Sequence, residues 1–128
     1  MDITGDALEV RIYMGESDRR EGVALFDAVV RFLRHKGCAG VTVLRGIEGF
    51  GAHSRIHSAS LLRLSEDLPI VVIAVDRRDR IEPLLGELTD YVSGGLVTVT
   101  PTSVVHYGMP APAVPAPGPN GPSGGEGS

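Results

Sequence analysis

Apolar and polar residues alternate near the start of the chain. Every second position from 8 to 14 is apolar: Leu8, Val10, Ile12 and Met14. This period of two predicts a strand over residues 7–15 with one apolar face.

The next apolar residues recur with the period of a helix, at Leu25, Val29, Phe32 and Leu33. Asp18 followed three residues later by Glu21 matches a capping box, which predicts that this helix begins near residue 18. Gly37 predicts its end, after a last turn rich in basic residues.

The middle of the chain predicts two strands separated by a long loop. Residues 41–44 are a strand candidate, whereas residues 46–60 fit neither period and contain three glycines, which predicts a loop. The apolar segments 61–64 and 70–75 predict a third strand region. Segment 70–75 is apolar at every position, as is typical of a strand buried on both faces.

A second helix and a last strand complete the pattern. The helix is predicted to open at Asp76 or Asp79, and Pro83, which is tolerated only near a first turn, favours Asp79. Its apolar stripe comprises Ile81, Leu84, Leu85, Leu88 and Val92. A last strand is predicted over residues 96–99, with a further segment over 104–107 and Pro101 marking an edge or a break.

The resulting order, β-α-β-β-α-β, predicts an α+β, ferredoxin-like fold. Such a fold has a four-stranded antiparallel sheet with two helices on one face. The other face of the sheet is left bare, although segment 70–75 is apolar on both faces. Self-association is the simplest way to cover it, so the pattern predicts a homo-oligomer.

Composition narrows the function classes. The net charge of −4, the aromatic content of 5% and the absence of tryptophan argue against nucleic-acid binding, which uses basic faces and stacking rings. Cys38 is the single cysteine and cannot form an internal disulfide. The longest apolar run, 68–75, is shorter than a membrane helix, and the N-terminus lacks a signal-peptide pattern. These features predict a soluble cytoplasmic protein.

The end of the chain differs from the rest. Six of the nine prolines lie in the last twenty residues, together with a single charged residue, Glu126. Such a segment buries too little apolar surface to offset its ordering entropy. We therefore predict a folded domain over residues 1–107 and a disordered tail over 108–128.

Candidate chemistry gathers around the long loop. The backbone N–H groups at Gly46, Gly49 and Gly51 could approach an anion, or these glycines could simply serve surface turns. Arg45 precedes them, and its guanidinium could bind a phosphate or carboxylate in a two-point contact, or form a salt bridge to Glu48 or another acid.

The loop histidines allow two other interpretations. His53 and His57 are spaced i, i+4, which suits a metal only if that stretch is helical, and exposed loop histidines are the simpler reading. Ser54 and Ser58 beside them allow a hydrolytic site, although no orienting acid is evident. Three arginines, Arg77, Arg78 and Arg80, cluster at a helix start, where the dipole disfavours cations.

Four segments together resemble the domain of unknown function 190 family. They are 43–51 (VLRGIEGFG), 56–57 (IH), 64–69 (LSEDLP) and 95–98 (GLVT). The family is similar in fold to the PII (GlnB-like) signalling proteins. The resemblance implies a homotrimer that holds a small effector, usually an adenine nucleotide, in three clefts between subunits. It also implies that the long loop is a switch presented to a partner, such as a membrane transporter, a channel or an enzyme; some members are linked to fluoride-export channels.

The resemblance also assigns residues. Arg45, Gly46, Gly49 and Gly51 would form the base of the switch loop, and Gly94, Gly95, Leu96 and Val97 would line the cleft from the other side. Phe50, His53, Arg55 and His57 would lie on the switch loop itself.

The chain departs from the nitrogen-regulatory PII pattern. Residues 46–60 contain no tyrosine, which argues against a uridylylation switch, and no lysine or arginine follows Arg80. A triphosphate draws much of its affinity from charge-assisted bonds. A monophosphate, a cyclic nucleotide or a non-nucleotide anion is therefore favoured over ATP.

The leading hypothesis is a non-enzymatic, PII-like effector sensor. The first alternative is a divalent-metal-binding trimer of the copper-tolerance type, resting on His53 and His57. The second is a small hydrolase that uses the same histidines.

Overall fold

The computed structural model describes residues 3–50 and 67–108 of the 128-residue chain. Its main sheet has the strand order β4-β5-β1-β6, comprising Val41–Arg45, Pro69–Arg77, Gly5–Gly15 and Leu96–Val104. A hairpin of β2 (Arg19–Arg20) and β3 (Val23–Ala24) precedes helix α1 (Leu25–His35). The second helical segment comprises α3 (Arg78–Ile81), the 3₁₀ helix η1 (Glu82–Leu84) and α4 (Leu85–Tyr91).

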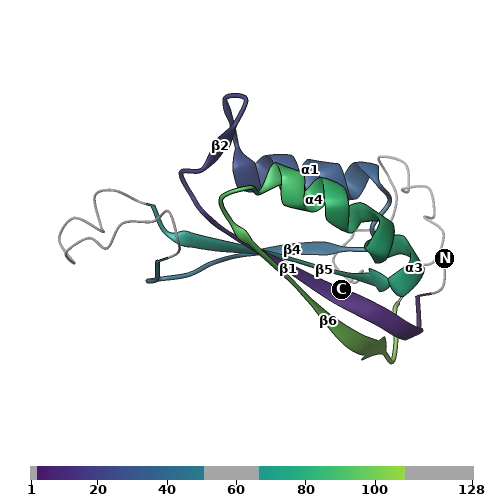
Figure 1. Ribbon diagram of the computed structural model, residues 1–128. Coiled ribbons are helices and arrows are strands. Elements are labelled where there is room, and N and C mark those ends of the chain that lie inside the picture. Colours follow the sequence, from purple (N-terminus) through teal and green to yellow (C-terminus); the bar gives the residue numbers. More distant parts are fainter. Residues whose placement is uncertain (1–2, 51–66, 109–128) are drawn as a thin grey trace, which may run out of the picture.

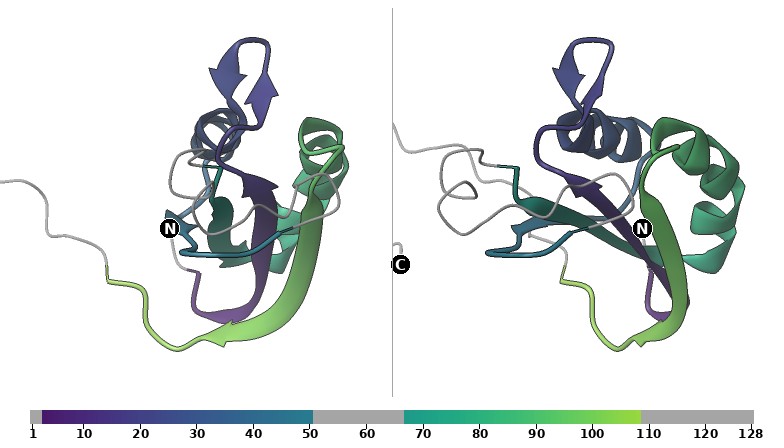
Figure 2. Two further views of the ribbon diagram at one scale, coloured as in Figure 1. Left: turned by 90° about the vertical axis from the view of Figure 1, so that its left-hand side faces the viewer. Right: turned by 60° about the vertical axis from the view of Figure 1, so that its left-hand side comes forward.

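Both helical segments lie on the same face of this sheet (Figure 1, Figure 2). All three strand pairs of the sheet are antiparallel. Each helical segment connects two parallel strands that have a third strand between them, which is the ferredoxin-like arrangement. The predicted fold class is therefore confirmed.

The core lies between the sheet and the helices. It is built from alternate positions of the two central strands and from one stripe of each helix: Leu8, Val10, Ile12, Ile70, Val72, Val29, Leu33 and Leu88. The period of two in β1 and the period of 3.6 in α1 thus bring their apolar faces together. Both predicted apolar patterns are confirmed.

The start of the first helix was predicted wrongly. Residues 19–24 form a hairpin whose two-residue turn, Glu21–Gly22, has positive φ at both positions (51° and 81°). This is the backbone of a type I′ turn. Asp18 does not cap the helix, because its carboxylate accepts a hydrogen bond from the Gly15 N–H at 3.0 Å. The helix begins at Leu25, directly after the hairpin.

The second helix is interrupted where the sequence predicted a first-turn proline. Pro83 lies in the 3₁₀ turn η1, which joins α3 to α4. Proline lacks an N–H and its ring crowds the preceding turn of an α-helix, so a tighter turn accommodates it. The apolar stripe is confirmed: Ile81, Leu84, Leu88 and Val92 are buried and Leu85 packs against them.

The last strand continues through Pro101. Strand β6 pairs with β1 over its whole length, and Pro101 lies opposite Leu8. Because β6 is an edge strand, a residue without an N–H is tolerated there. Of the two predicted meanings of Pro101, the edge is confirmed and the break is wrong.

No described helix covers the second face of the sheet. On β5 the residues beneath the helices are buried, whereas Val71, Ile73 and Val75 on the other face are half-buried. In the register of the sheet, Leu44 and Leu96 belong to this second face and are 52% and 55% exposed. The described part of one chain therefore does not provide the burial of segment 70–75 on both faces that the sequence predicted.

Several predictions fall outside the described residues. They are the strand segment 61–64, most of the long loop and the tail beyond Gly108. In the described part of the chain, the helices are too short or too polar to cross a membrane.

Candidate functional site

Arg45 is the last residue of β4 and carries an exposed side chain. Its guanidinium forms an ion pair with the carboxylate of Glu16, which follows β1. Of the two predicted roles for Arg45, the salt bridge is present, with Glu16 as the partner instead of Glu48. An incoming anion would therefore compete with Glu16 for this cation.

The glycines after Arg45 let the chain run close over β5. The Gly46 N–H donates a hydrogen bond to the Pro69 carbonyl oxygen at 2.7 Å. A Cβ atom at Gly46 would lie 2.8 Å from the Pro69 ring, and one at Gly49 would lie 3.2 Å from it. The Gly46 N–H is thus committed to the backbone, and both glycines permit a close approach to Pro69.

The apolar side chains that follow are exposed. Ile47 is 92% and Phe50 is 70% exposed, although both are large hydrophobic residues. Gly51, His53, Arg55 and His57 lie outside the described residues.

The residues predicted to form the second wall of the effector cleft, 94–97, lie at the start of β6. Gly94 lies in the turn after α4, Gly95 precedes β6, and Leu96 and Val97 begin the strand. A Cβ atom at Gly95 would lie only 2.4 Å from the Tyr13 carbonyl oxygen, so glycine is required for this approach to β1. Leu96 is exposed, whereas Val97 packs partly buried against the core.

The two predicted walls lie at the same end of the sheet but on opposite edges. Strand pairing aligns Leu44, Val71, Tyr13 and Leu96 in one row across the four strands. Three strand spacings separate the edges, which amounts to about 14 Å. One chain therefore does not bring Arg45 and Leu96 together.

Acidic side chains occupy this end of the sheet between the two walls. Asp18 accepts a hydrogen bond from the Gly15 N–H, and Asp67 accepts one from the Ser17 N–H at 3.1 Å. The carboxylates of Asp18 and Asp67 thus organise the turn after β1, whereas that of Glu16 pairs with Arg45. They also make the space between the edges unfavourable for an anion.

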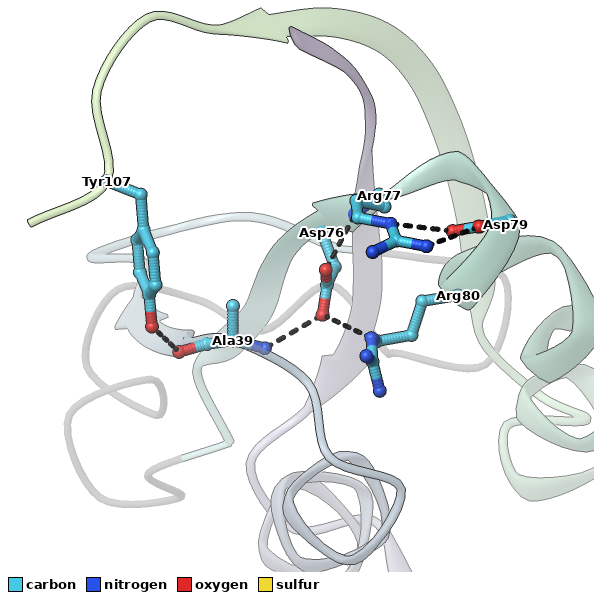
Figure 3. A network of polar contacts seen from close by, with 6 residues as sticks. All are labelled: Ala39, Asp76, Arg77, Asp79, Arg80 and Tyr107. Atoms are coloured by element: carbon cyan, nitrogen blue, oxygen red, sulfur yellow. Dashed lines mark hydrogen bonds and ion pairs between the residues drawn. The ribbon is translucent and has the colours of Figure 1, made fainter. Parts of the chain in front are cut away.

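A buried carboxylate that the sequence analysis missed lies at the other end of β5. Asp76 is fully buried and accepts hydrogen bonds from the Ala39 N–H at 2.9 Å and the Arg77 N–H at 2.7 Å. Figure 3 shows its carboxylate facing Arg80, whose Nε lies 3.3 Å away. The signal was present in the sequence, because the inward alternation of Ile70, Val72 and Ala74 continues to Asp76.

This network explains the arginine cluster at the helix start. Arg77 pairs with Asp79 at 2.6 Å, Arg78 with Asp6 at 3.2 Å, and Arg80 with Asp76. The hydrogen bonds from Arg77 lower the pKa of the Asp79 carboxyl. These cations therefore have intramolecular partners at a helix start that otherwise disfavours them.

The same network reaches the cysteine and the end of the last strand. Burial raises the pKa of the Cys38 thiol, and the nearby Asp76 charge raises it further. The thiol is therefore protonated at neutral pH. Tyr107 donates a hydrogen bond to the Ala39 carbonyl oxygen at 3.0 Å, which ties the segment after β6 to the start of β4 (Figure 3).

The metal alternative receives no support from the part of the chain that the structure describes. Within residues 3–50 and 67–108, no three His, Cys, Asp or Glu side chains are grouped as a metal site would require. His53 and His57, on which that alternative rests, lie outside these ranges.

Comparisons with known proteins give a consistent picture. A family model described as DUF190, Uncharacterized ACR, matches residues 7–104. The UPF0166 protein of Methanocaldococcus jannaschii is 30% identical over 92 residues, which cover 71% of this chain and 84% of that protein.

Solved structures match at lower identity. One is CPII from Thiomonas intermedia K12, described as a nitrogen regulatory PII-like protein bound to ADP, AMP and bicarbonate; the TM-score is 0.60 at 19% identity, over 79% of this chain and 90% of CPII. Another is described as a PII-like signalling protein from Thermus thermophilus, with a TM-score of 0.51 at 20% identity, over 81% of this chain and 91% of that protein. The fold is therefore PII-like.

Proposed function

This chain belongs to the DUF190 family, and on that premise we propose that it is a non-enzymatic, PII-like regulatory protein of the cytoplasm. Its effector is a small anion, with an adenine nucleotide as the first candidate. The effector binds in the clefts between the subunits of a homotrimer, and the loop over residues 46–60 transmits binding to a partner. The alignment of Leu44, Val71, Tyr13 and Leu96 in one row of the sheet carries this proposal.

The two walls lie at opposite ends of this row of four residues, which favours a site shared between subunits. Within one chain, Arg45 and the 94–97 segment lie on opposite edges, and acidic side chains occupy the space between them. A second copy that brings its β6 edge toward the β4 edge of the first supplies the missing wall without those acids. The arrangement is head-to-tail, so it closes into a ring when the rotation between copies allows it.

The bare face of the sheet supports assembly independently. Val71, Ile73 and Val75 are half-buried there, and Leu44 and Leu96 extend the apolar surface to both edges. The apolar row of Leu44, Val71, Tyr13 and Leu96 is characteristic of an interface, whereas the Glu9–Arg11 ion pair lies beside Val75 and Ile73 on the same face. The resemblance to PII-like proteins favours three copies, and light scattering should return a mass about three times the 13.5 kDa of one chain.

The choice of an adenine nucleotide rests on the neighbours in fold. CPII is described as bound to ADP, AMP and bicarbonate. In this chain Arg45 supplies a guanidinium that can take a phosphate or carboxylate in two hydrogen bonds. Because no lysine or arginine follows Arg80, the second wall adds no permanent cation, and nucleotides with few phosphates are favoured over ATP.

The described start of the loop supports its role as the partner-facing switch. Ile47 and Phe50 expose large apolar side chains to solvent, which costs free energy unless another surface covers them. A membrane transporter or channel is the class of partner that the family resemblance favours. Effector binding shifts the loop between states only if the effector interacts differently with each state.

Arg45→Ala is expected to weaken the binding of ADP and AMP by about tenfold, because a charge-assisted hydrogen bond to the effector is lost. Glu16→Gln is expected to strengthen binding by about two- to fivefold, since it frees Arg45 from its ion pair. Isothermal titration of the full-length chain measures both effects.

Arg34→Ala is the matched control, because it removes an exposed arginine of α1 without touching the sheet edges. Its affinity should equal that of the unmodified protein. If Arg45→Ala binds both nucleotides as tightly as Arg34→Ala does, Arg45 is not part of the effector site.

A further inference from the structure

A cavity lies on the helical side of the molecule, away from the bare face of the sheet and from the proposed effector cleft. It is an open cavity of about 340 Å³ between the β2–β3 hairpin, α1 and the end of α4. The hairpin projects beyond the helices in all three ribbon views (Figure 1, Figure 2). The cavity volume is at the lower end of the range of small-molecule sites, about 300–1,000 Å³.

Two aromatic side chains, Phe32 and Tyr91, form one wall of the cavity. Phe32 and Tyr91 pack with their ring centroids 4.9 Å apart, and Phe32 is buried. The Arg20 guanidinium lies over the Tyr91 ring at 3.9 Å. This contact restrains the guanidinium, while the N–H groups that do not face the ring remain able to donate.

Among the described residues, Arg20 lacks the acidic partner that its basic neighbours have. Arg31 pairs with Asp27 at 3.5 Å and Lys36 with Glu87 at 3.3 Å. Within residues 3–50 and 67–108, no carboxylate lies within ion-pair distance of Arg20. A guanidinium placed over an aromatic ring, with no carboxylate partner among the described residues, can bind an anion.

The remaining lining defines the kind of anion. Arg31 and His35 lie beside Arg20, and Val23 adds apolar surface. Glu21 also lines the cavity, so Arg20 and Arg31 supply two positive charges against its one negative charge, with Arg31 already paired to Asp27. This balance suits a monoanion better than a phosphate dianion, and the Phe32–Tyr91 wall suits a flat, apolar body.

We propose that this cavity binds a small aromatic carboxylate. The ring of the ligand packs against Phe32 and Val23, and its carboxylate takes two hydrogen bonds from the edge of the Arg20 guanidinium. Arg31 adds to the positive potential around the carboxylate. The site uses residues of a single subunit and does not depend on the effector cleft.

A substitution at Glu21 tests the site independently of Arg20. It occupies the first central position of the type I′ turn with φ of 51°, where asparagine is the favoured residue. Glu21→Asn therefore keeps the turn and removes the negative charge of the cavity. The proposal predicts that this variant binds an aromatic carboxylate about two- to threefold more tightly.

The test is a titration of the full-length protein with benzoate, phenylacetate and indole-3-acetate, followed by protein NMR. The expected result is saturable shifts at Arg20, Phe32 and Tyr91 with a dissociation constant of about 1 mM or lower. Arg20→Ala should weaken binding by about tenfold, whereas Arg34→Ala and Arg45→Ala should leave it unchanged. Tyr91→Phe keeps the ring and should bind normally, while Tyr91→Leu should bind weakly.

Acetate and benzyl alcohol are the matched probes, since each carries only half of the proposed ligand. Both should bind at least about tenfold more weakly than benzoate. The proposal is overturned if none of the three carboxylates shifts these residues, or if Arg20→Ala binds them as the unmodified protein does. It is also overturned if an acidic, aromatic peptide saturates the cavity while the free carboxylates do not, because the occupant is then a protein segment.

Discussion

Asp76→Ala is expected to lower the free energy of unfolding by about 3–5 kcal/mol, because it leaves the positive charge of Arg80 uncompensated in a partly buried place. The carboxylate accepts hydrogen bonds from the backbone N–H groups of Ala39 and Arg77, and these donors lose their partner as well. The Nε atom of Arg80 is buried and relies on the Asp76 carboxylate. The loss also loosens the link between β4, β5 and α3.

Urea denaturation at one fixed protein concentration measures this effect, since assembly makes apparent stability depend on concentration. Asp79→Ala is the control, because its carboxylate is exposed and pairs with Arg77 on the surface. That variant should lose less than about 1 kcal/mol. Adding Arg80→Met to Asp76→Ala should restore part of the loss. Equal stabilities of the Asp76→Ala and Asp79→Ala variants would contradict this account of the network.

Gly95→Ala is expected to cost about 3 kcal/mol, because the added Cβ atom would lie 2.4 Å from the Tyr13 carbonyl oxygen. The obstacle is the backbone of the central strand β1, which cannot move aside without disturbing its pairing with both neighbours. The variant therefore separates the start of β6 from β1. It should weaken effector binding as well as stability, because the 94–97 segment is displaced.

Gly86→Ala is the matched control for this substitution. Gly86 lies in α4 and a Cβ atom there would meet nothing within 4 Å. Alanine at that position should raise stability by about 0.5–1 kcal/mol, because glycine is costly within a helix. Thermal unfolding of the two variants side by side gives shifts of opposite sign. A melting temperature for Gly95→Ala equal to that of the unmodified protein would show that the approach to Tyr13 is looser than described.

The fold could be predicted from the sequence because its strongest signals are periodic. The alternation in β1 and the stripe of α1 each define a buried face over several turns or pleats. The hairpin could not be predicted in the same way, since Glu21–Gly22 lacks the asparagine or aspartate that usually marks a type I′ turn. The Asp18–Glu21 spacing then mimicked a capping box, although both residues belong to the turn and the hairpin.

The candidate site depends on pairings that are distant in sequence. Arg45 and Glu16 are separated by 29 residues, and only the sheet brings the ends of their strands together. The sequence also could not reveal that Arg45 and Leu96 lie on opposite edges of one row, which depends on the register of three strand pairs. Asp76 was interpreted as a possible helix start, whereas its inward position in β5 makes it a core residue.

The central claim, an effector site shared between subunits, can be tested by mixing two defective chains. Arg45→Ala removes one wall, and Leu96→Glu places a negative charge on the other at an exposed position. Each variant alone should bind ADP and AMP at least about tenfold more weakly than the unmodified protein. Coexpression with two different affinity tags allows assemblies that contain both variants to be purified.

Titration of these mixed assemblies with ADP and AMP is the most direct measurement. In a head-to-tail ring of three, every mixed assembly contains one cleft with both walls intact, so binding should return at about one site in three. If the site lay within a single chain, each chain would carry one defect and no site would be restored. Mixed assemblies that bind as poorly as their parents would therefore contradict the account.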